Sequence, residues 1–227
     1  MSEVSFETEI PKRIFCFWHD HDCIPPQIKK KLRNTYEAHE NQCDILFADD
    51  KYIVKLLSNE KNLLWLDLYQ ANRIPASRAD MARLAMVYYL GGIYIDASMG
   101  FHKSVFDIIK PESELVLLKR DDVDKSGRRI ANGIIGAKKG SFFIRDVMES
   151  VTDNLVTKRY NYNVWKATGP YNISIVSDEN LATQENITYL SMTTIMTSYM
   201  DYFRNRKNMP KIVNTWVDQQ SKGIFRI

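Results

Sequence analysis

The chain has 227 residues, of which 44% are hydrophobic and 26% are charged, and its formal net charge at pH 7 is +3. This composition is typical of a folded globular protein and excludes an intrinsically disordered chain. The length allows a core of ample size, so we expect one domain over residues 1–227. The small net charge indicates little by itself, and we expect no nucleic acid partner.

In chain order, the sequence alternates segments with strand and helix patterns. Such alternation with short connections implies a mixed, mostly parallel sheet covered by helices on both faces. The polar segment 121–129 has no periodicity and predicts a loop. Outside residues 75–98, the predicted elements are strands at 13–17, 43–48, 114–119 and 134–137, and helices at 26–40, 50–57, 62–70 and 142–156.

Residues 75–98 carry the most informative pattern in the chain. Pro75 can start a helix, Gly91 and Gly92 supply the positive φ that ends it, and a short buried strand follows at 93–95. The helix places Asp80 and Arg83, three residues apart, on one face, while Asp96 emerges where the strand stops. We therefore expect these three charged groups to converge on one crevice.

The cysteines and histidines give weaker indications of function. The cysteines, Cys16, Cys23 and Cys43, have no CxxC spacing and are odd in number, so we expect free thiols rather than a zinc cluster or a disulfide framework. His19 and His21 alternate with aspartates, which suggests a zinc site or, more simply, a polar turn.

Localisation follows from two observations. The sequence has no apolar run of the ~18–20 residues that a spanning helix needs, and residues 1–7 lack the parts of a signal peptide, so we expect a cytoplasmic protein. Its basic clusters are either solvated faces or attract anionic lipid head groups or a diphosphate-linked partner at the inner face of the membrane. These clusters lie at 29–33, 128–129, 138–139 and 204–207.

Segment 79–98 resembles the signature of GT-A glycosyltransferases with a DXD-type motif. The resemblance is greatest to the family of initiating α-1,6-mannosyltransferases and related capsular polysaccharide synthesis transferases. It continues in segments 10–18, 132–140 and 168–170 and so spans about residues 10–175. It implies an α/β, GT-A-like Rossmann-type fold that binds a nucleotide sugar.

The DXD-type motif itself reads Asp96-Ala97-Ser98, with Ser98 where the mannosyltransferase form has a second aspartate. By resemblance, Asp96 either accepts hydrogen bonds from ribose or donor-sugar hydroxyls or ligates Mg²⁺ or Mn²⁺. Ser98 is a neutral and weaker ligand, so the metal stays an open question, with Asn214 as a second candidate ligand. Asp96 as a turn cap or a surface charge is the plainer alternative.

Asp80 and Arg83 resemble the pair that holds the donor hexose in these enzymes, although a simple ion pair along a helix is the alternative. Trp18 resembles a tryptophan that stacks on the nucleobase, and it could instead be a core residue. Tyr94 is expected to pack more than to contact the donor. The predicted donor-binding set is Phe17, Trp18, Arg78, Asp80, Arg83, Tyr94, Asp96, Ala97, Ser98 and Trp216. The predicted catalytic set is Asp80, Arg83, Asp96, Asp122 and Asn132.

The resemblance implies a retaining glycosyltransferase that moves a sugar from a nucleoside diphosphate donor, preferably UDP-linked, to a saccharide or lipid-linked acceptor in bacterial surface polysaccharide synthesis. Arg and Lys side chains could replace a metal at the leaving diphosphate. Two rivals are a transferase that modifies protein and a noncatalytic protein that binds sugar nucleotides.

Overall fold

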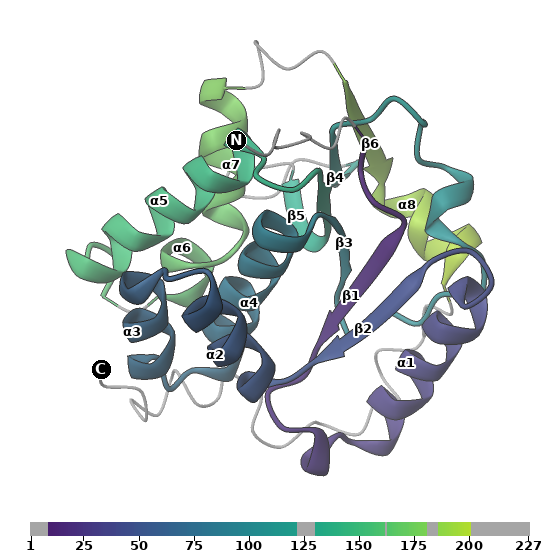
Figure 1. Ribbon diagram of the computed structural model, residues 1–227. Helices are drawn as coiled ribbons and strands as arrows, with labels where there is room; N and C mark the ends of the chain where they lie inside the picture. The colour runs from purple at the N-terminus through teal and green to yellow at the C-terminus, as the bar shows by residue number, and fades with distance from the viewer. Residues whose placement is uncertain (1–8, 122–129, 162, 181–185, 201–227) are drawn as a thin grey trace, which may run out of the picture.

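The computed structural model describes residues 9–121, 130–161, 163–180 and 186–200. Asp122, Asn214 and Trp216, named above, lie outside the described residues. One sheet occupies the middle of the molecule, with α1 and α8 on one side and the other helices on the opposite side (Figure 1). This arrangement confirms the expected α/β architecture.

The sheet has six strands in the order β2-β1-β3-β5-β4-β6. Strand β1 pairs in parallel with β2 and β3, and β4 pairs in parallel with β6, while β5 runs antiparallel to both β3 and β4. The expected mixed, mostly parallel sheet is therefore confirmed. The strands are β1 (Arg13–Phe17), β2 (Asp44–Ala48), β3 (Gly92–Ile95), β4 (Leu115–Lys119), β5 (Ile130–Ala137) and β6 (Ile187–Ser191).

The helices agree with the sequence pattern in the first two thirds of the chain. The short elements after residue 156 and strand β6 have no counterpart among the predicted elements. The helices are α1 (Pro26–His39), α2 (Asp50–Asn59), α3 (Leu63–Ala71), α4 (Pro75–Leu90), α5 (Phe142–Val156), α6 (Val164–Ala167), α7 (Pro170–Asn180) and α8 (Met192–Thr194).

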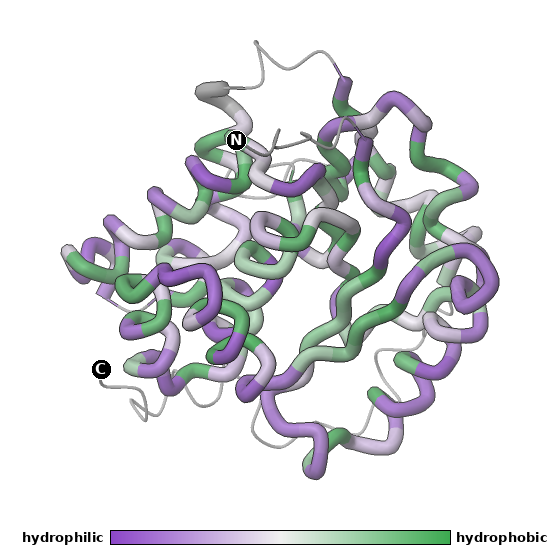
Figure 2. The backbone as a smooth tube through the Cα atoms, viewed as in Figure 1, coloured by the Kyte–Doolittle hydropathy of each residue, from purple (hydrophilic) through white to green (hydrophobic). Residues whose placement is uncertain are grey.

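Both faces of the sheet are buried, because each has its own hydrophobic cluster. Along β1, Phe15 and Phe17 join the cluster beneath α2, α4 and α5, whereas Ile14 and Cys16 join the cluster beneath α1. Alternating side chains of a strand point to opposite faces, so a strand buried on both sides is apolar throughout. Figure 2 shows the contrasting pattern in α1, which alternates hydrophobic and hydrophilic segments because only one of its faces is covered.

Helix α4 leads directly into β3 through the predicted glycine pair. Gly91 and Gly92 have φ angles of 66° and 127°, which L side chains rarely adopt. A Cβ atom on Gly91 would lie 2.8 Å from the backbone nitrogen of Lys139, and one on Gly92 would lie 2.8 Å from the carbonyl oxygen of Arg13. The pair thus lets β3 begin beside β1 immediately after the helix ends.

The cysteines are free thiols, with Cys16 buried and Cys23 exposed. Residues 21–23 form a short 3₁₀ helix that Asp20 caps by accepting a hydrogen bond from the backbone nitrogen of Asp22. None of the helices in the described ranges combines the length and the apolar character that crossing a membrane requires.

Candidate functional site

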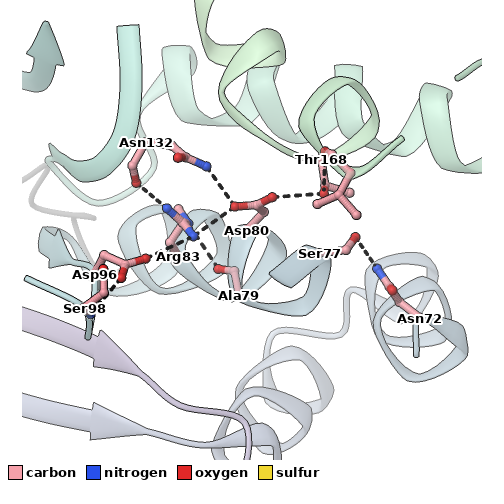
Figure 3. Close-up of polar contacts among 10 residues, drawn as sticks. Asn72, Ser77, Ala79, Asp80, Arg83, Asp96, Ser98, Asn132 and Thr168 are labelled. Carbon is pink, nitrogen blue, oxygen red and sulfur yellow. Dashed lines mark hydrogen bonds and ion pairs between the residues drawn. The ribbon is translucent and has the colours of Figure 1, made fainter. Parts of the chain in front are cut away.

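Three charged side chains meet where α4 passes the end of β3 (Figure 3). Arg83 Nη2 lies 2.9 Å from Asp80 Oδ1 and 3.8 Å from Asp96 Oδ2. Asp80 and Arg83 come from one face of α4, and Asp96 directly follows β3, as the spacing predicts. The expected convergence of the three groups is therefore present.

Asp80 is almost fully buried and its carboxylate accepts from three side chains. Asn132 Nδ2 donates to Oδ1 at 2.8 Å alongside Arg83, and Thr168 Oγ1 donates to Oδ2 at 3.1 Å. A carboxylate has about four acceptor positions, so these contacts leave one on Oδ2. Asp80 is thus held rigidly while keeping the capacity for one further hydrogen bond.

Arg83 is equally buried and equally constrained. Its Nε donates to the carbonyl oxygen of Ala79 at 3.2 Å, its Nη1 donates to the carbonyl oxygen of Asn132, and its guanidinium lies 4.7 Å from the centre of the Tyr94 ring. Tyr94 is 1% exposed and therefore packs against Arg83, in line with the expectation that it is mainly a packing residue. The guanidinium can act only in this one orientation.

The acid–base properties of the cluster follow from burial and charge. Burial raises the pKa of Asp80 to about 6, and the neighbouring Arg83, Thr168 and Asn132 act in the opposite direction because each favours the carboxylate. Burial lowers the pKa of Arg83, but Tyr94 and the two aspartates more than offset this effect, so the pKa is raised overall. At neutral pH the cluster is a buried carboxylate held against a permanent cation.

Asp96 lies at a turn and is about one third exposed, its side chain showing 32% of its surface. Its Oδ1 accepts from the backbone nitrogen of Ser98 at 2.8 Å, and its own backbone nitrogen donates to the carbonyl oxygen of Gly133 at 2.8 Å. Asp96 therefore does cap the turn, which was the plainer alternative to a functional role. It uses only one of the two oxygens, and Oδ2 stays turned toward Arg83.

An irregularity in β5 supplies two of these contacts. Leu117 of β4 pairs with Ile135, but Leu118 pairs with Ala131, so the register shifts between them. Asn132 and Gly133 lie within the shifted part, and their carbonyl oxygens accept from Arg83 and from Asp96. Bulges of this kind often lie next to active sites because they redirect backbone groups.

The described residues do not by themselves fit a resident divalent cation. In the described ranges, no three histidine, cysteine or acidic side chains come close enough to hold a metal ion, the His19–His21 segment included. Near the motif the donor set is one carboxylate, one of whose oxygens already caps the turn, and the neutral hydroxyl of Ser98. Hard cations such as Mg²⁺ prefer several oxygen ligands, usually including more than one anionic group or phosphate.

Trp18 follows β1, whose end lies beside that of β3 in the parallel pair. Its backbone nitrogen donates to the carbonyl oxygen of Ala48 at 3.0 Å, and its ring packs partly on the α1-side cluster. The buried indole Nε1 has no hydrogen-bond partner among the described residues. Phe17 and Ala97 are buried, so they can meet a ligand mainly through their backbone.

Arg78 belongs to a second polar group, which it forms with residues of α2 and α3. Its Nη1 lies 2.6 Å from Asp50 Oδ2, and the hydroxyl of Tyr69 donates to Asp50 Oδ1 at 2.5 Å. Burial lowers the pKa of His19, and the positive charge of Arg78 lowers it further, whereas Asp50 and Asp20 act in the opposite direction. The sequence pattern did not indicate Asp50 or Tyr69, because only the packing of α2 and α3 against α4 places them there.

Thr168 contacts the Asp80–Arg83 pair and was also not indicated by the sequence pattern. The turn at 168–170 belongs to the family resemblance, yet nothing in it predicts a hydrogen bond to a helix 88 positions earlier. Asn132 is in the predicted catalytic set, and its amide and its carbonyl oxygen both hold the Asp80–Arg83 pair. Asn132 and Thr168 therefore hold the Asp80–Arg83 pair in place, although neither belongs to α4.

Part of the chain matches a known protein family, and two known proteins are similar to most of it. Residues 25–116 match the family described as "Glycosyltransferase sugar-binding region containing DXD motif". An uncharacterized glycosyltransferase of Acanthamoeba polyphaga mimivirus is 26% identical over 189 residues, which cover 76% of this chain and 72% of the viral protein. The mannosyl phosphorylinositol ceramide synthase of Saccharomyces cerevisiae is 25% identical over 174 residues, which cover 74% of this chain and 42% of the yeast protein.

Solved structures agree on the fold. The PaToxG glycosyltransferase has a TM-score of 0.59 at 18% identity, covering 77% of this chain and 71% of its own. The UDP-bound glycosyltransferase domain from the YGT toxin has a TM-score of 0.52 at 9% identity, covering 85% and 83%. The expected GT-A-like fold is therefore confirmed, and the matching family and relatives are glycosyltransferases, the enzyme class that the sequence predicts.

Proposed function

We propose that this protein transfers a hexose from a nucleoside diphosphate sugar, preferably UDP-linked, to a saccharide or lipid-linked acceptor. The observation that carries the proposal is the buried Asp80–Arg83 pair beside the partly exposed Asp96, within the segment that matches the sugar-binding family. A strand end with convergent polar groups is where α/β proteins usually bind nucleotides.

Each residue then has a separate role in holding the donor. The last acceptor position of Asp80 takes a sugar hydroxyl, and Asp96 Oδ2 takes a hydroxyl of the ribose or of the sugar. Trp18 stacks on the base through its partly exposed ring. Arg83 keeps both aspartates oriented and lends positive charge to the neighbouring phosphates.

Transfer proceeds with retention at the anomeric carbon. The bond from this carbon to the β-phosphate oxygen breaks, and its electron pair goes to that oxygen. The acceptor hydroxyl oxygen then bonds to the anomeric carbon from the same face, and its proton passes to the leaving diphosphate. The protein contributes position and electrostatic stabilisation of the phosphate charge.

Different relatives support the proposed identities of the donor and of the acceptor. The glycosyltransferase domain from the YGT toxin is a UDP-bound structure, which favours a uridine donor. The name of the yeast relative describes mannosyl transfer to a lipid, which favours a lipid-linked acceptor. Bacterial surface polysaccharide synthesis at the membrane remains the setting that the sequence predicts.

The test is donor hydrolysis and transfer with a panel of UDP- and GDP-sugars. Slow hydrolysis of one donor by the purified protein, accelerated by an oligosaccharide or lipid-linked saccharide, is the expected result. Acceleration by a protein acceptor alone would favour the protein-modifying rival. Binding of a sugar nucleotide without any turnover would favour the noncatalytic one.

A further inference from the structure

Lys31 of α1 contacts the DXD-type turn from the face of the sheet that α1 covers, whereas Arg83 of α4 lies on the opposite face. Its Nζ donates to the carbonyl oxygen of Ser98 at 2.5 Å. The same turn carries Asp96, whose carboxylate caps the backbone nitrogen of Ser98. The ammonium therefore lies at the residue that replaces the second aspartate of the motif.

The position of Lys31 is fixed by a stripe of α1 that binds the segment after the turn. Thr35 Oγ1 donates to the carbonyl oxygen of Met99 at 3.1 Å and accepts from the backbone nitrogen of Phe101 at 3.2 Å. His39 Nε2 accepts from the backbone nitrogen of Val105 at 2.9 Å. Lys31, Thr35 and His39 are four residues apart, so they follow one face of the helix.

Helix α1 packs closely against Gly100, two residues after Ser98, at the level of Lys31. A Cβ atom on Gly100 would lie 3.1 Å from Lys31 Cγ and 3.3 Å from Lys31 Cα. The glycine thus allows the helix to approach the loop at the level of Lys31. The lysine stem is held against the loop, and its ammonium is directed along it to the motif.

The charge balance at the turn differs from that of a site with two carboxylates. Ser98 removes one negative charge, and Lys31 adds one positive charge close enough for Asp96 to stabilise it. Half-burial lowers the pKa of Lys31, and Asp96 opposes this effect by favouring the ammonium. A positive charge at this point repels a divalent cation and attracts a phosphate.

We infer that the ammonium of Lys31 binds the diphosphate of the donor and supplies there part of the positive charge that a metal ion supplies in enzymes with a complete DXD motif. This inference rests on the proposed function. An ammonium has three N–H donors, so it can bind a phosphate oxygen while it keeps its bond to Ser98. In the transfer step Lys31 stabilises the charge that develops on the leaving β-phosphate oxygen and takes no proton from it.

The test measures UDP and UMP binding by calorimetry in buffer with excess EDTA. Lys31→Met is expected to weaken UDP binding by roughly 10-fold or more, the usual effect of losing one charge-assisted hydrogen bond, and to weaken UMP binding less. Lys31→Arg should recover most of the loss. Lys30→Met is the matched control, because Lys30 is an exposed lysine on the same helix and should leave UDP binding unchanged.

A structural role of Lys31 gives a different result. Thr35→Val loosens the same loop without changing its charge. If Thr35→Val weakens UDP binding as much as Lys31→Met does, or if Lys31→Met binds UDP within about twofold of the wild type, the inference is wrong while the proposed function stands. If the wild-type protein binds neither UDP nor GDP, the proposed function itself fails, and the inference fails with it.

Discussion

Asp96 is the residue at which structural and functional roles can be separated. An asparagine keeps a side-chain oxygen that can accept from the backbone nitrogen of Ser98, so Asp96→Asn should leave the turn and the melting temperature nearly unchanged. It removes the charge next to Arg83 and the donor, and we expect turnover to fall by at least about 100-fold, or about 2.7 kcal/mol. Steady-state donor hydrolysis measures this change. Turnover close to that of the wild type would place the reactive site elsewhere.

Asp80 makes activity depend on pH in a defined direction. Its pKa of about 6 means that the carboxylate becomes protonated as the pH falls through that value, and acceptance of the sugar hydroxyl is lost. We therefore expect kcat/KM to fall below about pH 6. Thr168 lowers the pKa of Asp80 by donating to it, so Thr168→Val should move the acidic limb of the profile to higher pH. An unmoved limb would show that another group titrates.

The same pKa has the opposite consequence for stability. The folded state binds a proton to Asp80 more tightly than the unfolded chain, in which the ordinary value is 3.8. Taken alone, Asp80 makes the fold less stable as the pH rises from about 4 to about 6. The proposed donor-binding carboxylate of Asp80 is therefore kept ionised at neutral pH at some cost to the stability of the fold.

Ser98 can be used to examine metal binding. Ser98→Asp adds a second carboxylate beside Asp96, so we expect Mn²⁺ to bind more tightly than to the wild type, and most clearly when UDP supplies phosphate ligands. Calorimetric titration of Mn²⁺ into each protein, with and without UDP, measures the difference. Tight stoichiometric binding to the wild-type protein without nucleotide would reveal ligands other than Asp96 and Ser98.

At the scale of elements, the helix-to-strand junction at Gly91 is the clearest point of backbone constraint. Gly91→Ala meets both a strained φ and the nearby Lys139 backbone, whereas Gly140 has a similar φ of 71° with none of the described atoms within 4 Å. A backbone conformation with positive φ should cost each alanine about 1–3 kcal/mol, and Gly91→Ala should cost more because of the clash and because its ψ of 149° lies outside the left-handed helical region. Urea unfolding of both variants measures this difference. If both alanine variants lose the same unfolding free energy, the backbone at Lys139 moves aside without a measurable cost.

The sequence predicted the elements whose patterns are local and strong. Strand β1 is apolar from Ile14 to Phe17, α1 has a clear apolar stripe, and the glycines after α4 mark its end, so these features were predicted closely. The elements α6, α7 and β6 were not predicted, because α6 is a single turn and α7 has no marked apolar face. Similarly, Asp80 and Arg83 were visible from their spacing, but Thr168 joins them only through the packed fold.

At the scale of the whole molecule, donor binding should stabilise the fold. A ligand that binds only the folded state and is present at 100 times its Kd raises the free energy of unfolding by about 2.7 kcal/mol. We expect UDP or a UDP-sugar to raise the melting temperature accordingly in a thermal-shift assay. If no nucleoside diphosphate sugar changes the melting temperature at millimolar concentration, the central claim of the proposed function is wrong.

The register shift in β5 has a consequence for how this protein can be improved. Regular pairing of β5 with β4 would add ladder hydrogen bonds and favour the sheet, but it would also withdraw the carbonyl oxygens that Arg83 and Asp96 use. Selection for thermostability alone would therefore tend to favour variants in which β5 pairs regularly with β4, and these variants would lose activity. A stabilisation campaign should leave residues 131–134 untouched and score every variant for turnover as well as for melting temperature.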